Sequence, residues 1–257
     1  MNTFWVLTLL LVMTTGFSQP ASQPTSPTAE RVPVVVELFT SEGCSSCPAA
    51  DATLRELETA QPVPGVEVIA LGEHVDYWNR LGWKDPFSSA QFSARQRAYT
   101  AHFTEGNYTP QAIVNGRYEL VGSRRQELSQ RLTEAARAPH AIVLLTVAAG
   151  RVAVQVRSLP TGTKAAHVIL AITETDLSTQ VGRGENAGQL LRHAAVVRTL
   201  RTLGLVSTSS TFAATVPLSI DPIWKINHLQ AVVLVQDISS QHVIGVASLP
   251  LGASAAN

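Results

Sequence analysis

The sequence predicts an α/β domain followed by an all-β, immunoglobulin-like sandwich, behind a short N-terminal export segment. Three observations support this prediction. Strand-like and helix-like segments alternate over residues 32–139. Short strand-like runs fill residues 141–257 without any clear helical period. The 257 residues are 45% apolar and 15% charged, a composition that can bury a core.

The N-terminus is expected to be a signal peptide over residues 1–18. Residues 4–13 form an apolar run of ten, which fits a secretory signal and is shorter than the roughly 20 residues of a membrane span. Gly16 and Ser18 are the small residues expected before the cleavage point. No Lys or Arg precedes the apolar run, so an uncleaved anchor is the alternative. We therefore expect a periplasmic or secreted protein with no stable membrane span, whose residues 19–31 form a disordered linker.

The first predicted domain follows the element order β-α-β-α-β-β-α. Its strands are short β-branched or apolar runs, and its helices place apolar side chains three or four positions apart. Asn115-Gly116 is typical of a two-residue hairpin turn between the last two strands. In chain order the predicted segments are 34–39, 48–60, 66–71, 89–102, 112–114, 118–121 and 124–138.

The second predicted domain contains seven strands, the number expected for an antiparallel sandwich. Pro139 marks the boundary between the two domains. The predicted strands are 141–148, 152–156, 166–173, 195–200, 211–218, 229–236 and 243–248.

Charge and motif content exclude several classes of function. Nineteen basic and nineteen acidic residues balance, which argues against nucleic-acid binding through a basic surface. Two cysteines are too few for a four-thiolate zinc site, and no phosphate-binding glycine motif is present. The sequence therefore predicts no cofactor and no metal site. Arg95 and Arg97, on the second predicted helix, are interpreted as solvent-exposed.

Cys44-Ser45-Ser46-Cys47 is the motif that carries chemistry, because it lies between the first strand and the first helix. A cysteine at a helix N-terminus meets free backbone N–H groups and the positive end of the helix dipole, which favour the thiolate. Cys44 is therefore predicted to attack a disulfide and Cys47 to resolve the mixed intermediate. Cys44 is expected to lie nearer to solvent, with Cys47 shielded by the helix. A purely structural disulfide and half of a metal site are the alternatives.

At these residues the chain resembles the thioredoxin fold, in element order and in the Cys-x-x-Cys motif. Thr109-Pro110 matches the position of that fold's cis-proline, which faces the two cysteines and helps to hold an extended substrate. The chain further resembles a family of secreted bacterial thioredoxin-like proteins that carries a domain-of-unknown-function label. The segments that carry this resemblance are 37–48, 74–78, 82–87 and 108–111, with 184–188, 191–193 and 196–198 in the second half.

Residues around the motif supply further candidates. The resemblance implies that Glu37 is a buried carboxylate that assists proton transfer to the resolving thiol, and a surface glutamate is the alternative. His74, Asp76 and Trp78 are interpreted as a substrate-binding cluster after the second strand. A well-packed loop is the alternative. A metal role for His74 and Asp76 lacks a helical histidine pair to support it.

The predicted function is exchange of disulfides, outside the cytoplasm, with a protein or small thiol. A separate thiol-redox protein is the expected partner that restores the pair. The alternative is a non-catalytic binding protein. It would be either a copper-handling module that uses the two cysteines with His74, or a ligand-binding sandwich beside an inert redox domain.

Overall fold

The computed structural model describes Met1 and residues 31–252. The predicted signal peptide and nearly all of the predicted linker lie outside the described residues. Within the described part, none of the helices combines the length and the apolar character needed to cross a bilayer.

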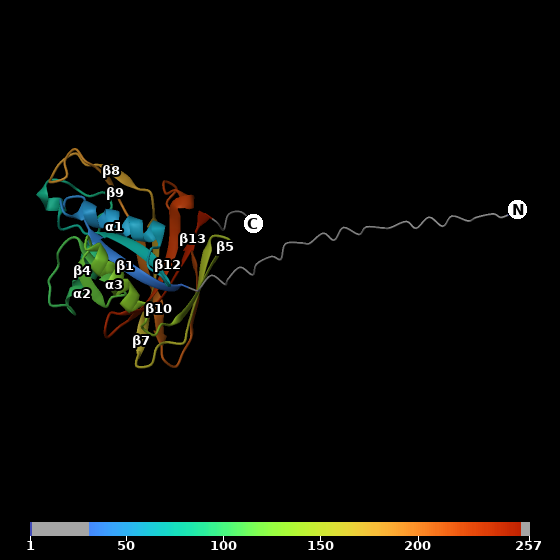
Figure 1. Cartoon of the computed structure of the whole chain (residues 1–257). Coiled ribbons are helices and arrows are strands. Elements are labelled where there is room, and N and C mark those ends of the chain that lie inside the picture. The colour runs from blue at the N-terminus through green and yellow to red at the C-terminus, as the bar shows by residue number, and fades with distance from the viewer. Residues whose placement is uncertain (2–30, 253–257) are drawn as a thin grey trace.

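One mixed sheet of eight strands dominates the structure (Figure 1), in the order β13-β12-β7-β10-β2-β1-β3-β4. Strand β10 (Val196–Ser207) pairs with β2 (Val66–His74) where Val196 lies beside Gly72. Strands from both predicted domains therefore share one sheet, and strands account for 42% of the chain against 19% for helices. The prediction of a thioredoxin-like α/β domain followed by a separate immunoglobulin-like sandwich is wrong.

The first part of the chain forms its elements in the predicted order. Asn115 and Gly116 both have positive φ, 46° and 63°, as the predicted two-residue hairpin turn requires. A 3-10 helix, Asn79–Leu81, follows β2. The other elements are β1 (Val32–Thr40), α1 (Cys47–Ala60), α2 (Ala90–Thr100), β3 (Gln111–Val114), β4 (Tyr118–Val121) and α3 (Arg125–Ala135).

The second part of the chain extends the large sheet and builds two smaller sheets. Strands β7 (Ala165–Glu174), β12 (Leu229–Asp237) and β13 (Val243–Pro250) continue the large sheet beyond β10. A three-stranded sheet contains β5 (Ile142–Ala148), β6 (Arg151–Arg157) and β11 (Phe212–Pro217). A hairpin that the sequence did not predict joins β8 (Ser178–Gln180) to β9 (Leu190–Arg192), and it lies beside α1 (Figure 1).

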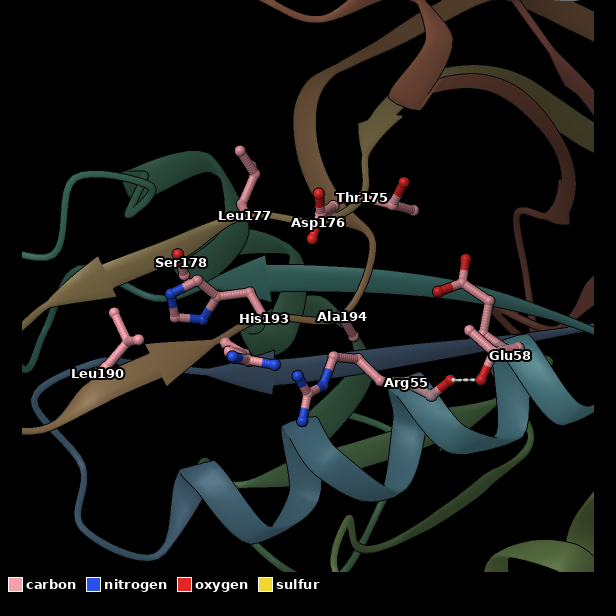
Figure 2. Close-up of a pocket in the computed structure, with 11 residues that line it drawn as sticks. Arg55, Glu58, Thr175, Asp176, Leu177, Ser178, Leu190, His193 and Ala194 are labelled. Carbon is pink, nitrogen blue, oxygen red and sulfur yellow. Dashed lines mark hydrogen bonds between the residues drawn. The ribbon is translucent and has the colours of Figure 1, made fainter.

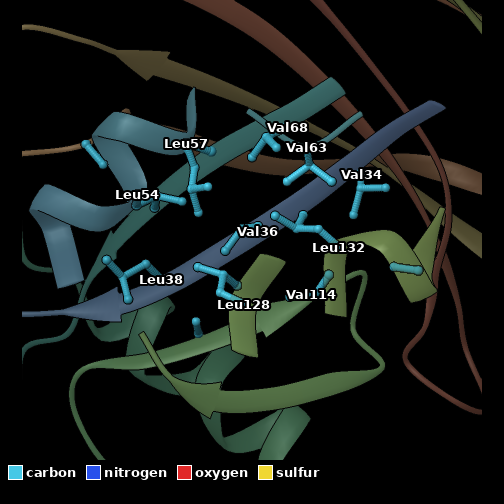
Figure 3. Packing of buried hydrophobic residues seen from close by; sticks show 14 of the residues in the cluster. Val34, Val36, Leu38, Leu54, Leu57, Val63, Val68, Val114, Leu128 and Leu132 are labelled. Carbon is cyan, nitrogen blue, oxygen red and sulfur yellow. The ribbon is translucent and has the colours of Figure 1, made fainter. Parts of the chain in front are cut away.

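Alternation along β1 decides which side chains face which helices. Its even-numbered residues, Val34, Val36 and Leu38, pack against leucines of α1 and α3 (Figure 3). Its odd-numbered residues face the opposite side of the sheet. There Val35 belongs to a cluster that includes Phe92 of α2 and Val232 of β12. Side chains from both predicted domains thus form one continuous core under α2.

Candidate active site

The two cysteines lie between β1 and the first turn of α1, as predicted. Helix α1 begins at Cys47, and Pro48 lies in its first turn. Proline lacks a backbone N–H, but an N–H in the first turn has no acceptor within the helix, so no helical hydrogen bond is lost. The backbone N–H of Cys47 donates to the carbonyl of Cys44 at 3.2 Å. The two sulfur atoms lie 2.5 Å apart, and both cysteines are free. We call residues 41–47 the dithiol loop.

The two thiols differ strongly in acidity. A hydrogen bond from Cys47 lowers the pKa of Cys44 from 9.0 to about 6, and Ser46 adds to this effect although burial opposes it. Burial raises the pKa of Cys47 far above its usual value, and the negative charges of Cys44 and Asp51 raise it further. Cys44 is therefore mostly thiolate at neutral pH, while Cys47 keeps its proton.

Exposure does not separate the two cysteines, although Cys44 was expected to lie nearer to solvent, because both are only 1% exposed. The connection between β8 and β9, residues 181–189, lies against the dithiol loop. Asn186 Nδ2 donates to the carbonyls of Glu42 and Cys44, at 2.8 and 3.0 Å. The Glu185 carboxylate accepts from the backbone N–H of Ser45 at 3.0 Å. We call residues 181–189 the cover loop.

Two glycines let the cover loop pass over the indole of Trp83. A Cβ at Gly182 would lie 3.2 Å from the Trp83 ring, and Gly184 has a φ of +82° that favours glycine. Trp83 Nε1 in turn donates to Glu42 Oε2 at 2.7 Å. The cover loop is thus seated on Trp83 and bonded to the backbone around Cys44.

We expect Asn186→Ala to raise the alkylation rate of Cys44 by about tenfold. The variant loses two hydrogen bonds, each with a net contribution of about 0.5–1.5 kcal/mol, so the open form of the cover loop becomes more populated. The rate is measured with iodoacetamide on the reduced protein. Arg183→Ala, an exposed change in the same loop, serves as the control. Equal rates for both variants and the parent would contradict a covering role.

The Thr109-Pro110 peptide is cis, which confirms the prediction. The sulfur of Cys44 lies 3.8 Å from the carbonyl oxygen of Thr109. The side chain of Thr109 accepts a hydrogen bond from Trp78 Nε1 at 2.8 Å. Three of the predicted site residues, Thr109, Pro110 and Trp78, are therefore brought to the dithiol loop.

Glu37 is buried, as the resemblance implies, but it lies on the other face of the sheet. Its carboxylate accepts from Arg95 Nε and from the Tyr99 hydroxyl, both at 2.5 Å. The carboxylate near Cys47 belongs to Asp51, which accepts a hydrogen bond from Thr40 Oγ1 at 2.8 Å. Asp51 follows Cys47 by four residues, a spacing that places two helical side chains on one face and that the sequence prediction overlooked.

His74 and Asp76 do not form a substrate platform with Trp78. His74 is 1% exposed, and its Nδ1 lies 2.7 Å from Asp85 Oδ2. Asp76 accepts a hydrogen bond from Ser93 Oγ at the start of α2. Both side chains thus bind within the protein, which agrees with the alternative of a well-packed loop.

A group of metal-ligand type lies behind the dithiol loop. Asp51, His74 and His193 place one donor atom each within 4.8 Å of one another, and no other such group of His, Cys, Asp and Glu occurs among the described residues. Neither cysteine belongs to it. Sequence reasoning missed His193, because it follows the unpredicted strand β9 and its neighbours are far away in the sequence.

The fold and the site define a class of protein in which a strand–Cys-x-x-Cys–helix unit is built into a large mixed sheet. The chain belongs to the family described as "Protein of unknown function (DUF1223)", whose model matches residues 35–236. This match covers the dithiol loop, Thr109-Pro110, the cover loop and His193. The predicted membership of a domain-of-unknown-function family is confirmed, whereas the comparisons do not support its thioredoxin-like assignment.

The chain is similar to a protein from Agrobacterium tumefaciens of known crystal structure. The two share 31% identity with a TM-score of 0.69, over 86% of this chain and 95% of the other. A β-glucuronidase from Bacteroides uniformis aligns at 10% identity over 42% of this chain and 12% of its own, with a TM-score of 0.18 that carries no argument. No match was found among curated proteins.

Proposed function

We propose that the protein is a thiol-disulfide oxidoreductase in which Cys44 attacks and Cys47 resolves. The observation that carries the proposal is the opposite shift of the two thiol pKa values within one Cys-x-x-Cys at the start of a helix. A purely structural bridge does not require one sulfur to be held as a thiolate and the other as its hydrogen-bond donor. Of the two thiols, only Cys44 is predisposed to act as a nucleophile at neutral pH.

The exchange proceeds in two balanced steps. The Cys44 thiolate attacks one sulfur of the substrate disulfide, so a Cys44–substrate disulfide forms and the other substrate sulfur leaves as a thiolate. Cys47 then gives its proton to that thiolate and attacks the sulfur of Cys44. The second substrate sulfur leaves as a thiolate. The substrate gains two electrons, and the Cys44–Cys47 pair becomes a disulfide.

The surroundings of Cys44 favour a substrate with an extended backbone beside the sulfur. The Thr109 carbonyl accepts only a long contact of 3.8 Å from the Cys44 sulfur, so once Cys44 is a thiolate this carbonyl can accept a hydrogen bond from a peptide N–H. The Trp78 indole offers a flat apolar surface beside it. We infer a protein or small-thiol substrate outside the cytoplasm, where a disulfide persists. Because Cys44 is buried, the cover loop has to move before a substrate sulfur reaches it.

The alternatives of a binding protein find less support. The copper-handling module was predicted to use His74 beside the two sulfurs, but the donor group that includes His74 contains neither cysteine. The ligand-binding sandwich beside an inert domain depends on a separate second domain. Four of its strands, β7, β10, β12 and β13, instead belong to the same sheet as β1, the strand that leads into the dithiol loop.

The proposal is tested by the pH dependence of alkylation in the reduced protein. Cys44 should react with a midpoint near pH 6, because the thiolate reacts and its pKa is lowered to about 6. The rate should fall as the pH drops through 6 and level off above 7. Cys47 should stay unmodified over the same range, because burial raises its pKa. Peptide mass spectrometry after a short iodoacetamide pulse separates the two sites.

The denatured protein is the control for this measurement, since both thiols should then react with a midpoint near the unperturbed value of about 8.5. A native midpoint close to that value, or equal modification of both cysteines, would overturn the proposed division of roles. The pair would then be a structural bridge.

A further inference from the structure

A buried group of two histidines and one carboxylate lies close to the dithiol loop but outside it. Asp51 comes from α1, His74 from the end of β2, and His193 from the residue after β9. Their side chains are 4%, 1% and 3% exposed. Three distant segments of the chain therefore bring ligand-type side chains to one enclosed point.

Each of the three side chains has a buried polar atom without a hydrogen-bond partner in the part of the chain that the structure describes. These atoms are Asp51 Oδ1, His74 Nε2 and His193 Nε2. Buried polar atoms in native proteins are nearly always paired, and an unpaired one calls for an explanation such as a bound ion. The three residues that carry these atoms also place one donor atom each within 4.8 Å of one another, so a single ion could bind all three residues.

The opposite atoms of two of these side chains are already held. His74 Nδ1 lies 2.7 Å from Asp85 Oδ2, and Asp51 Oδ2 accepts from Thr40 at 2.8 Å. A carboxylate acceptor at Nδ1 fixes the proton there, which leaves the Nε2 lone pair free. This is the arrangement that orients metal-binding histidines in proteins. Asp85 is itself held by the backbone N–H groups of Glu42 and Phe87.

The charge of the surroundings also favours a cation. Three carboxylates, those of Asp51, Asp85 and Glu42, are buried around the two imidazoles. Glu42 Oε1 lies at ion-pair distance, 2.9 Å, from His193 Nε2, although neither atom makes a hydrogen bond among the described residues. Buried carboxylates are paired or bind metals in folded proteins, because an isolated buried charge is strongly unfavourable. A dication at the three ligands would offset most of this negative charge.

We propose that Asp51, His74 and His193 bind a divalent transition-metal ion of the zinc class. Two imidazole nitrogens with one carboxylate oxygen suit zinc and other borderline divalent metals better than magnesium or calcium, which prefer oxygen ligands alone. Three protein ligands leave a further coordination position, as in catalytic rather than structural zinc sites. This site is separate from the two sulfurs and does not depend on the proposed disulfide exchange.

A surface pocket lies next to this site. A pocket of about 610 Å³ opens between α1 and the β8–β9 hairpin (Figure 2), and His193 is one of its lining residues. Arg55 of α1 and Ser178 of β8 also line it. His193 therefore belongs both to the pocket wall and to the ligand group, and we expect an ion to enter from this side.

The test uses the mature chain with both cysteines replaced, Cys44→Ser with Cys47→Ser, so that no thiol binds metal. The protein is stripped with chelator, incubated with zinc, freed of excess metal and analysed by mass spectrometry of the metal. We expect about one zinc per chain. His193→Gln and His74→Gln in this background should each weaken zinc binding at least tenfold, as loss of a ligand does.

His167→Gln is the matched control. His167 also has an unpartnered ring nitrogen among the described residues, but it belongs to no such donor group. This variant should bind zinc like the parent. Less than a tenth of an ion per chain in the parent, or equal binding in the parent and both ligand variants, would overturn the proposal.

Two further readouts keep the test decisive if a histidine variant folds poorly. Cobalt in the cysteine-free parent should give visible ligand-field bands without sulfur-to-cobalt charge transfer, and Asp51→Asn should alter them. Zinc should also raise the Tm of the parent and not that of the ligand variants. Absence of cobalt bands together with an unchanged Tm would overturn the site. Failure of disulfide exchange leaves all of these results unaffected, since the cysteines are absent.

Discussion

Cys47→Ser is expected to trap substrates as stable mixed disulfides, whereas Cys44→Ser is expected to trap none. In the first variant the attacking thiolate remains and the group that resolves the intermediate is gone. Serine also keeps a hydroxyl at the position from which Cys47 donates to Cys44, the largest influence that lowers the pKa of Cys44. Exchange activity should fall to the background rate in both variants, but only Cys47→Ser should accumulate the covalent intermediate.

The measurement is intact-protein mass spectrometry after incubation with oxidised glutathione, followed by acid quenching. Cys47→Ser should gain one glutathione that reductant removes, and Cys44→Ser should gain none at neutral pH. In an extract of the source cell, Cys47→Ser should give reductant-sensitive bands on a gel.

Cys47→Ala provides a sharper comparison with Cys47→Ser. Alanine removes the hydrogen-bond donor as well as the sulfur, so the pKa of Cys44 should rise from about 6 towards 9.0. Adduct formation at pH 7 should then be much slower than in Cys47→Ser. Equal adducts on the Cys44 and Cys47 variants would show that either sulfur attacks, and the assignment of roles would be wrong.

The dithiol loop was predictable from sequence because its chemistry is local. A buried strand, a Cys-x-x-Cys and an amphipathic helix follow one another within residues 34–60, and each has its own pattern. Asn186 and His193 were not predictable in the same way. They flank β9, which has only three residues and shows no usable alternation.

The fold class was misjudged because alternation identifies strands without saying which strands pair. The junction of the large sheet is the contact of Gly72 with Ala195 and Val196, where Gly72 N donates to the carbonyl of Ala195. A Cβ at Gly72 would lie 3.2 Å from that oxygen. A glycine in a buried strand often marks such a close backbone approach, and this was the signal available in the sequence. The pairing register of β10 with β7 also shifts at two places along β10. These shifts interrupt the alternation of side chains, so the sequence predicted only the first part of this strand.

The alternation of side chains along β1 corrects the role that the resemblance implied for Glu37. Residues 34, 36 and 38 pack toward α1, so residue 37 faces away from the cysteines. Arg95, interpreted as solvent-exposed, is instead the partner of Glu37 beneath α2.

Arg95→Met is expected to lower the free energy of unfolding by about 3–5 kcal/mol, the usual result of leaving a buried charge without its partner. Arg95 Nε lies 2.5 Å from Glu37 and 3.4 Å from Glu73, and both carboxylates are 0% exposed. Burial raises the pKa of Glu73 well above its usual value, with the nearby charge of Glu37 adding to this effect. Burial thus favours the neutral form of Glu73, and Glu37 is the nearer of the two carboxylates to Arg95.

The loss is measured by urea unfolding of the parent and the variant, with Arg97→Met as the matched control. Arg97 is an exposed residue of the same helix, and its replacement should change stability by no more than about 0.5 kcal/mol. The double variant with Glu37→Gln should recover much of the lost stability, because it removes the unpaired charge. Equal losses for the two arginine variants, or no recovery in the double variant, would mean that the pair under α2 contributes no more than an exposed one.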